Sequence, residues 1–177
     1  MEESLKMEPT RKNDDNICLA CGLCCDGSLI GFVHLDTDEI PRLKEIMEIE
    51  ETHGNGFFLQ PCKKYCDGCT IYVDRPKNCD KFNCGLLKSV ENKEIEFDYA
   101  LDKIQEVKQR KITIEKQIAF LQIELKSISF YFKMVELKKR LKKIEIEGVL
   151  SNEQEALSSN LEKLDSLVIK EFGVSLD

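Results

Sequence analysis

Nine cysteines, all between Cys18 and Cys84, are the residues of this 177-residue chain whose types and spacing could do chemistry. Four of them fall within CLACGLCC, residues 18 to 25, with the spacing CxxCxxCC. Two residues between cysteines let a tight turn direct both sulfurs at one ion, and Gly22 suits that turn because glycine tolerates positive φ. This first cluster indicates thiolate metal ligands at Cys18, Cys21, Cys24 and Cys25.

A second cluster follows in the stretch from Pro61 to Cys84. It supplies Cys62, Cys66, Cys69, Cys79 and Cys84. One four-thiolate site would leave five cysteines unused, whereas two such sites need eight of the nine. Because adjacent side chains point apart, we expect Cys24 and Cys25 to serve different sites. The count predicts two metal centres, or one cluster and one zinc ion, and the spacing alone does not identify the spare cysteine.

The compartment decides between metal binding and disulfide bonding. The net charge of -7 gives no general attraction to nucleic acid or anionic membrane. The first fifteen residues are acidic and lack the apolar core of a secretion signal, and no apolar run approaches the length of a membrane span. These features predict a cytoplasmic protein, whose thiols stay reduced. A disulfide scaffold expects an oxidising compartment and an even number of cysteines, so metal binding is favoured.

The combined pattern resembles the YkgJ-like family of CxxCxxCC proteins, whose cysteine-cluster domains chelate zinc or iron. The resemblance covers residues 15 to 88 and rests on Cys18, Cys21, Cys24, Cys25, Cys62, Cys69, Ile71, Tyr72, Arg75, Pro76, Cys79, Phe82 and Cys84. It implies zinc or an iron-sulfur cluster such as 4Fe-4S, with Cys66 outside the family pattern as a substitute ligand or a spare thiol. The segment is also similar to the cluster domain of flagellin lysine methylases. This chain is shorter and has no Gly-rich cofactor loop, so we do not expect a complete methylase.

Other polar residues of this segment have supporting roles in the prediction. Thiolates around divalent metal leave a negative charge that nearby cations reduce. We expect Arg75 to donate hydrogen bonds beside the thiolates, because its planar fork carries several donors. Lys77 and Lys81 either share that role or are solvated. His34 and His53 are less favoured as ligands, since the cysteines already supply the eight ligands that two four-coordinate sites need.

The rest of the chain predicts helices. No glycine occurs between Gly85 and Gly148, and apolar residues recur every three or four positions from Val107 to Val135, as is typical of a coiled coil. The sequence SNEQ at residues 151 to 154 predicts a capping box that begins another helix, and Gly173 follows the expected end of that helix. We therefore expect a mostly α protein. Its parts are a flexible N-terminus at residues 1–14, a small irregular metal-stabilised cysteine-cluster domain at 15–88, and a long helical hairpin or coiled-coil extension at 89–177.

The sequence thus predicts a metal-binding protein that holds zinc and/or an iron-sulfur cluster. The apolar stripe is longer than a second helix could cover, so its uncovered part must meet the cysteine-cluster domain, a second copy or a partner protein. We expect self-association or a stable partner through residues 104–135. An iron-sulfur redox protein, or an accessory subunit of a protein- or peptide-modifying enzyme, is the alternative. No Ser-His-Asp pattern, HExxH, P-loop or pair of catalytic acids is present, so autonomous catalysis is less favoured. The basic run at residues 133–143 is expected to be solvated or paired rather than to bind nucleic acid.

Overall fold

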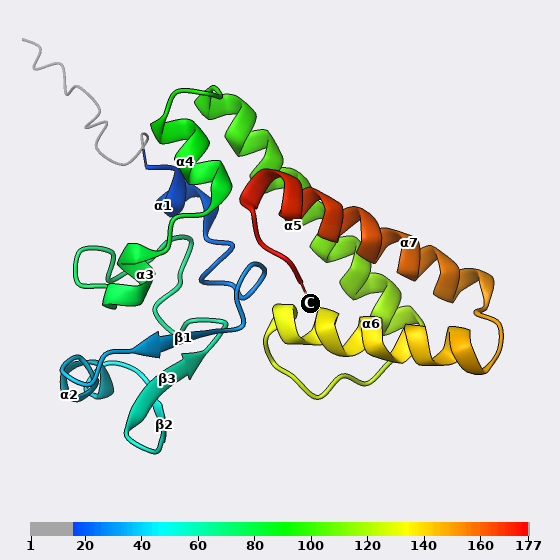
Figure 1. Cartoon of the computed structure of the whole chain (residues 1–177), viewed down its shortest axis with the longest axis horizontal. Helices are drawn as coiled ribbons and strands as arrows, with labels where there is room; N and C mark the ends of the chain where they lie inside the picture. The colour runs from blue at the N-terminus through cyan, green and yellow to red at the C-terminus, as the bar shows by residue number, and fades with distance from the viewer. Residues whose placement is uncertain (1–15, 177) are drawn as a thin grey trace, which may run out of the picture.

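The computed structural model describes residues 16–176 and is mostly helical, as the sequence predicts. The flexible N-terminus predicted at residues 1–14 lies outside the described residues. Figure 1 shows two parts side by side: an irregular, cysteine-containing part with a small sheet, and three longer helices. Among the described residues, no helix combines the length and the apolar character that crossing a membrane requires.

Short elements separated by turns make up the cysteine-containing part. In chain order they are α1 (Ile17–Cys21), β1 (Phe32–Leu35), α2 (Ile40–Lys44), β2 (Glu50–Thr52), β3 (Asn55–Leu59), α3 (Lys77–Lys81) and α4 (Gly85–Glu91). The strands form an antiparallel sheet in the order β1-β3-β2, with Val33 opposite Phe58. The side chains of β1 alternate between exposed and buried, as period-two patterning requires. One face of this sheet therefore packs inward.

Three helices make up the other part: α5 (Phe97–Phe120), α6 (Phe130–Glu147) and α7 (Asn152–Leu167), which continues as the π-helical turn η1 (Val168–Phe172). The capping box predicted at the start of α7 is confirmed, with Ser151 and Gln154 satisfying each other's backbone N–H groups. Gly148 and Gly173 follow the helices α6 and η1 as their C-caps. Helix α7 packs against both α5 and α6. The local helix signals in the sequence are therefore accurate.

The apolar stripe predicted from Val107 to Val135 does not lie on one helix. Residues 121–129 interrupt it, and Gln122 adopts a left-handed φ of 52° immediately after α5. This break lets α6 return alongside α7, so three helices replace the expected hairpin. Ile114 and Met134, one on each side of the break, are both fully buried. Intramolecular packing therefore covers much of the stripe that we expected a partner to cover.

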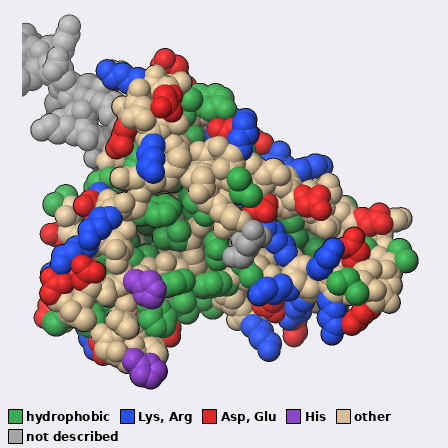
Figure 2. Space-filling view, viewed as in Figure 1, with side chains coloured by type: hydrophobic (Ala, Val, Ile, Leu, Met, Phe, Trp, Pro, Cys, Tyr) green, Lys and Arg blue, Asp and Glu red, His purple; other side chains and the backbone are tan. Residues whose placement is uncertain are grey.

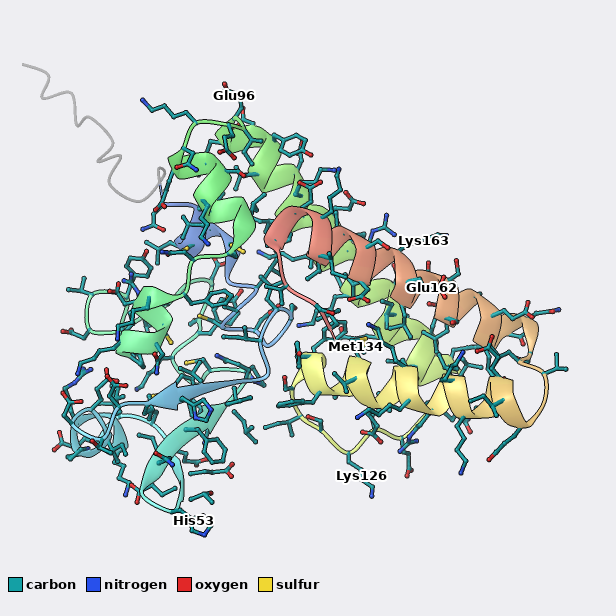
Figure 3. All side chains as sticks on the ribbon, in the orientation of Figure 1. His53, Glu96, Lys126, Met134, Glu162 and Lys163 are labelled. Atoms are coloured by element: carbon teal, nitrogen blue, oxygen red, sulfur yellow. The ribbon has the colours of Figure 1, made fainter. Side chains whose placement is uncertain are left out.

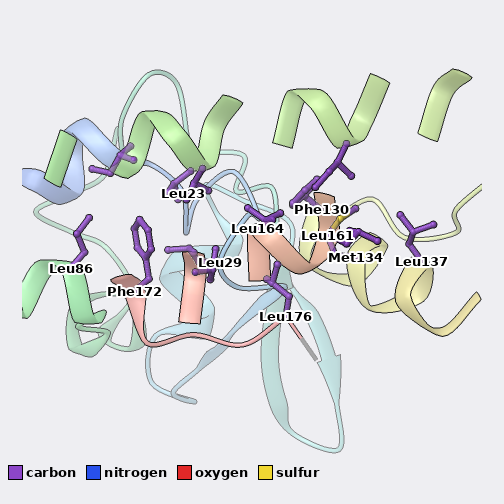
Figure 4. Packing of buried hydrophobic residues seen from close by; sticks show 14 of the residues in the cluster. Leu23, Leu29, Leu86, Phe130, Met134, Leu137, Leu161, Leu164, Phe172 and Leu176 are labelled. Atoms are coloured by element: carbon purple, nitrogen blue, oxygen red, sulfur yellow. The ribbon is translucent and has the colours of Figure 1, made fainter. Parts of the chain in front are cut away.

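The main hydrophobic core joins the two parts of the molecule. Leu23, Leu29 and Leu86 from the cysteine-containing part pack in one cluster with the three helices (Figure 4). Phe172 and Leu176, near the end of the described chain, close this core. A smaller, separate cluster lies under the sheet and contains Val33, Leu35, Ile40, Leu43, Met47 and Phe58. The cysteines therefore pack partly against the main core and partly against the small one.

Candidate metal centre

Eight of the nine cysteines line a single cavity of about 390 Å³. The ninth, Cys66, is exposed and is not among the residues that line it. Figure 3 shows sulfur atoms, in yellow, between α1, α3, α4 and the sheet. All nine cysteines are free thiols. Within residues 16–176, no three His, Cys, Asp or Glu side chains are arranged to hold a metal ion directly. The thiols surround a space rather than meeting at a point.

Four of these thiols, which we name the outer group, pack against the main core. They are Cys18, Cys21, Cys24 and Cys84. Asn16 caps α1 by accepting hydrogen bonds from the backbone N–H groups of Cys18 and Leu19, and so fixes the helix that carries the first two. Cys84 is itself the N-cap of α4, and its sulfur accepts a hydrogen bond from the N–H of Leu87 at 3.4 Å. Helix α1, the turn that follows it and the N-terminus of α4 thus present this group.

The other four thiols, which we name the inner group, lie toward the sheet. They are Cys25, Cys62, Cys69 and Cys79. Cys62 and Cys79 pack against the small core under the sheet. The backbone N–H of Cys62 donates to the carbonyl of Cys25 at 2.7 Å, and its sulfur accepts from the N–H of Lys64 at 3.4 Å. N–H groups directed at sulfur are the usual surroundings of thiolate ligands.

The electrostatics of the thiols follow the same division. Burial, with a smaller contribution from the charge of Cys84, raises the pKa of Cys18 to about 11 and that of Cys21 to about 12. Burial also raises the pKa of Cys25 to about 12, followed by the charges of Cys69, Cys62 and Cys79. The two groups meet at the adjacent residues Cys24 and Cys25. Burial raises the pKa of Cys24, and the charge of Cys25 adds to that increase. Burial therefore favours the protonated form of Cys18, Cys21, Cys24 and Cys25 when no cation is bound.

Arg75 lies on the cavity wall between the two groups. Burial raises the pKa of Cys18 in the outer group and of Cys79 in the inner group, while the charge of Arg75 lowers both. The guanidinium stacks 3.9 Å from the ring centroid of Tyr72, donates to the carbonyl of Tyr72 and pairs with Asp80. These contacts hold one cation within reach of both groups.

Two contacts that the sequence did not predict connect the segments of the two groups. The side-chain amide of Asn16 donates to the Tyr72 hydroxyl at 2.9 Å, which joins the cap of α1 to the loop between Cys69 and Cys79. Gly22 has a φ of 68°, and a Cβ at this position would come within 2.5 Å of the Tyr65 ring. No local pattern indicates either contact, because each joins residues far apart in sequence.

Helix α5 brings two lysines to the first cysteine motif. The Nζ of Lys111 pairs with the Asp26 carboxylate at 3.0 Å, and both side chains are about four-fifths buried. The Nζ of Lys108 reaches the Ala20 carbonyl at 3.5 Å, and its charge lowers the pKa of Cys21 against the larger effect of burial. Lys111 interrupts the apolar stripe in the sequence, and that interruption is the signal that could have identified this contact.

The remaining candidate residues lie away from the cavity. His34 is on an exposed position of β1 with its ring 4.8 Å from that of Phe32, and His53 lies at the tip of the β2–β3 hairpin (Figure 3). Lys77 pairs with Asp38 on the surface. Lys81 is exposed, and none of these four residues lines the cavity. Arg75 is therefore the predicted cation that the structure places beside the thiols.

Comparison of the chain with protein-family models, with curated proteins and with solved structures finds no match. The geometry of the cavity and the spacing of the cysteines therefore carry the functional argument.

Proposed function

We propose that the protein binds metal through two four-cysteine centres, one in the outer group and one in the inner group. One observation carries this proposal: eight cysteines from distant parts of the chain line one cavity, and the exposed Cys66 does not. The packing supports this division, since the outer group packs against the main core and two inner-group thiols, Cys62 and Cys79, pack against the small core. Four thiolates are a full ligand set for zinc or for an iron-sulfur cluster. The resemblance to the YkgJ-like family supports the same assignment.

The size of the cavity favours centres that contribute atoms of their own. A zinc ion requires its thiolates at about 2.3 Å and fills almost no space between them. An iron-sulfur cluster places several iron and sulfide atoms between its cysteines. A cavity of about 390 Å³ lined by eight thiols has room for such clusters. We therefore favour iron-sulfur, including 4Fe-4S, for at least one centre, and zinc for a centre whose thiols close around a single ion.

The test is the metal and acid-labile sulfide content of the full chain after anaerobic purification, together with its absorption spectrum. Iron with stoichiometric sulfide and a brown colour would establish iron-sulfur binding, and two zinc ions in a colourless protein would establish two zinc centres. Cys21→Ser should lose the outer centre and Cys79→Ser the inner centre, whereas the matched variant Cys66→Ser should retain both. A wild-type chain without bound metal, or equal losses in all three variants, would contradict the proposal.

We propose a second, separate role for the three helices in self-association or in docking a protein partner. The supporting observation is that Phe120, Ile146 and Val149, at the ends of α5 and α6, are between 74% and 88% exposed. Sedimentation of the wild type and of the double variant Phe120→Lys, Val149→Lys tests this role. A wild-type assembly that the double variant loses, with metal content unchanged, would support it. A monomeric wild type would leave only the docking of a different protein.

A further inference from the structure

Gln60 lines the same cavity and is buried, with only 1% of its surface exposed. Its side-chain oxygen Oε1 has no hydrogen-bond partner. A buried polar atom without a partner is rare in a folded protein, because it has lost its hydration without compensation. Among the described residues, Ser129 Oγ is the only other such side-chain atom. Gln60 therefore requires an explanation that the protein's own contacts do not supply.

The backbone holds Gln60 next to the inner group. Its N–H donates to the Gly31 carbonyl at 2.9 Å, directly after β3. Two residues later, the backbone N–H of Cys62 donates to the carbonyl of Cys25, so Gln60 lies near the backbone of two inner-group cysteines. The Gln60 Cβ and the Ser129 Oγ lie 3.1 Å and 3.2 Å from where a Cβ of Gly27 would be, so the lack of a side chain at Gly27 makes room for both. Gln60 thus packs closely on the backbone at Gly27 and lines the cavity.

Metal binding determines which hydrogen-bond partners the cavity holds for the Gln60 carboxamide. Once deprotonated on a metal, thiolate and sulfide are acceptors only. A half-turn about the Cγ–Cδ bond exchanges the oxygen and nitrogen of a carboxamide at almost no steric cost. The same side chain can thereby present N–H donors to anionic sulfur.

We propose that the Gln60 carboxamide donates a hydrogen bond to sulfur at the inner centre and stabilises its bound state. Gln60 is then a positioning residue rather than a metal ligand, since four thiols already complete the set. The inference rests on the proposed metal-binding function and adds a neutral donor that acts on one centre only. Hydrogen bonds to cluster sulfur raise the reduction potential, and the loss of such a contact weakens metal binding.

The experiment compares Gln60→Met, which keeps the side-chain length without a donor, with Gln60→Glu, which keeps the shape but adds a negative charge. Each full-length variant is titrated with a competing chelator. Gln60→Met should weaken the inner centre about 10-fold and leave the outer centre unchanged, and Gln60→Glu should weaken it more. If the centres are iron-sulfur clusters, one reduction potential should also become more negative. If Gln60→Met does not fold, Gln60→Glu carries the test because it has the same size.

Ser129→Ala is the matched control. It removes the other unpartnered atom, which lies 3.2 Å from where a Cβ of Gly27 would be and does not line the cavity. We expect it to change neither affinity nor potential. Unchanged inner-centre affinity in both Gln60 variants would overturn the inference, as would an equal effect of Ser129→Ala, which would indicate a water molecule shared by the two side chains. A wild-type chain that binds no metal would instead show that the proposed function itself is wrong.

Discussion

At the residue scale, Arg75 differs from the cysteines because it acts on both groups at once. Its contacts with Tyr72 and Asp80 fix the guanidinium in place, and its charge lowers the pKa of a thiol on each side of the cavity. The two proposed centres, with four thiolates each, would accumulate negative charge, which a shared cation reduces. The sequence alone favoured Arg75 over the neighbouring lysines because of its planar fork, and the structure places it on the cavity wall.

We predict that Arg75→Met weakens metal binding at both centres, by about 10- to 100-fold, which is the usual effect of losing a group that supports metal ligands. Arg75→Lys should be intermediate, because it keeps the charge but not the fork. Chelator competition measures both affinities in each variant. Lys77→Met is the control, since Lys77 is exposed and its ammonium pairs with surface carboxylates. An effect confined to one centre would contradict the shared role.

The raised pKa of a buried thiol predicts that the stability of the metal-free chain depends on pH. Burial raises the pKa of Cys21 from 9.0 to about 12 in the folded, metal-free chain. As the pH rises above 9, the unfolded chain releases this proton before the folded chain does, so the free energy of unfolding should fall between about pH 9 and pH 12. Below pH 9 the thiol is protonated in both states, so it does not make the free energy of unfolding depend on pH.

Urea unfolding with chelator and reductant, at pH 8 and pH 10, measures this difference. Cys21→Ser should show a smaller loss of stability than the wild type, whereas Cys66→Ser should match the wild type because Cys66 is exposed. The metal-loaded protein should respond in the opposite direction. Protons compete with the metal for the thiolates, so acid should release the metal. If the free energy of unfolding falls equally between pH 8 and pH 10 in the wild type and in Cys21→Ser, Cys21 does not cause the pH dependence.

At the element scale, α5 connects the helices to the first cysteine motif. The ion pair between Lys111 and Asp26 lies at this junction, one residue after Cys25, and Lys111 also donates to the Ser28 hydroxyl at 3.3 Å. The Lys111 Nζ lies 5.0 Å from the centroid of the Phe130 ring, at the start of α6. A single side chain therefore joins the cysteine motif to two helices.

We predict that Lys111→Met destabilises the protein by about 1 to 3 kcal/mol, because it leaves the largely buried Asp26 carboxylate without its partner. Lys142→Met also removes an ion pair from a helix, but its side chain is 70% exposed, so the change should be within about 0.5 kcal/mol. Chemical denaturation of both variants measures the difference. Equal effects would show that the buried position of the pair is unimportant.

The elements also show what sequence patterns can and cannot predict. The capping box at Ser151 and the C-cap at Gly173 follow from side-chain chemistry within a few residues, and both were predicted correctly. The interruption at residues 121–129 was missed because the apolar period continues through it. Periodicity identifies the apolar face of a helix, but not which element covers that face. Helix α6 returns along the molecule because it packs against α7, and no pattern within α6 itself indicates that contact.

At the scale of the whole molecule, the division into a cysteine domain and a helical extension is only approximate. The main core crosses the boundary expected at residue 88, since Leu23 and Leu86 pack with the three helices. The assignment of thiols to groups was also beyond the sequence, because spacing cannot show that Cys84 joins the first motif. Figure 2 shows hydrophobic side chains gathered where the sheet part meets the helices. Burial, rather than chain order, defines this junction.

These two cores predict an uneven response to metal removal. The outer group packs on the large core, whereas Cys62 and Cys79 of the inner group pack on the small core under the sheet. We predict that chelation increases proteolysis mainly between residues 62 and 84 and leaves the three helices protected. Limited proteolysis with mass spectrometry checks this pattern, and Cys66→Ser should show the wild-type pattern with metal bound. Uniform protection after complete metal removal would contradict it.

The order of the two groups along the chain has a further consequence, for the sequence of assembly. Every inner-group cysteine lies between Cys24 and Cys84, so joining the outer group closes a loop that contains the whole inner group. Closing that loop removes chain entropy that the inner centre would otherwise have to overcome. Loading should therefore be directional: Cys84→Ser should lower occupancy of both centres, whereas Cys79→Ser should spare the outer one. Metal counts on these two variants measure the asymmetry, and equal losses would indicate independent filling.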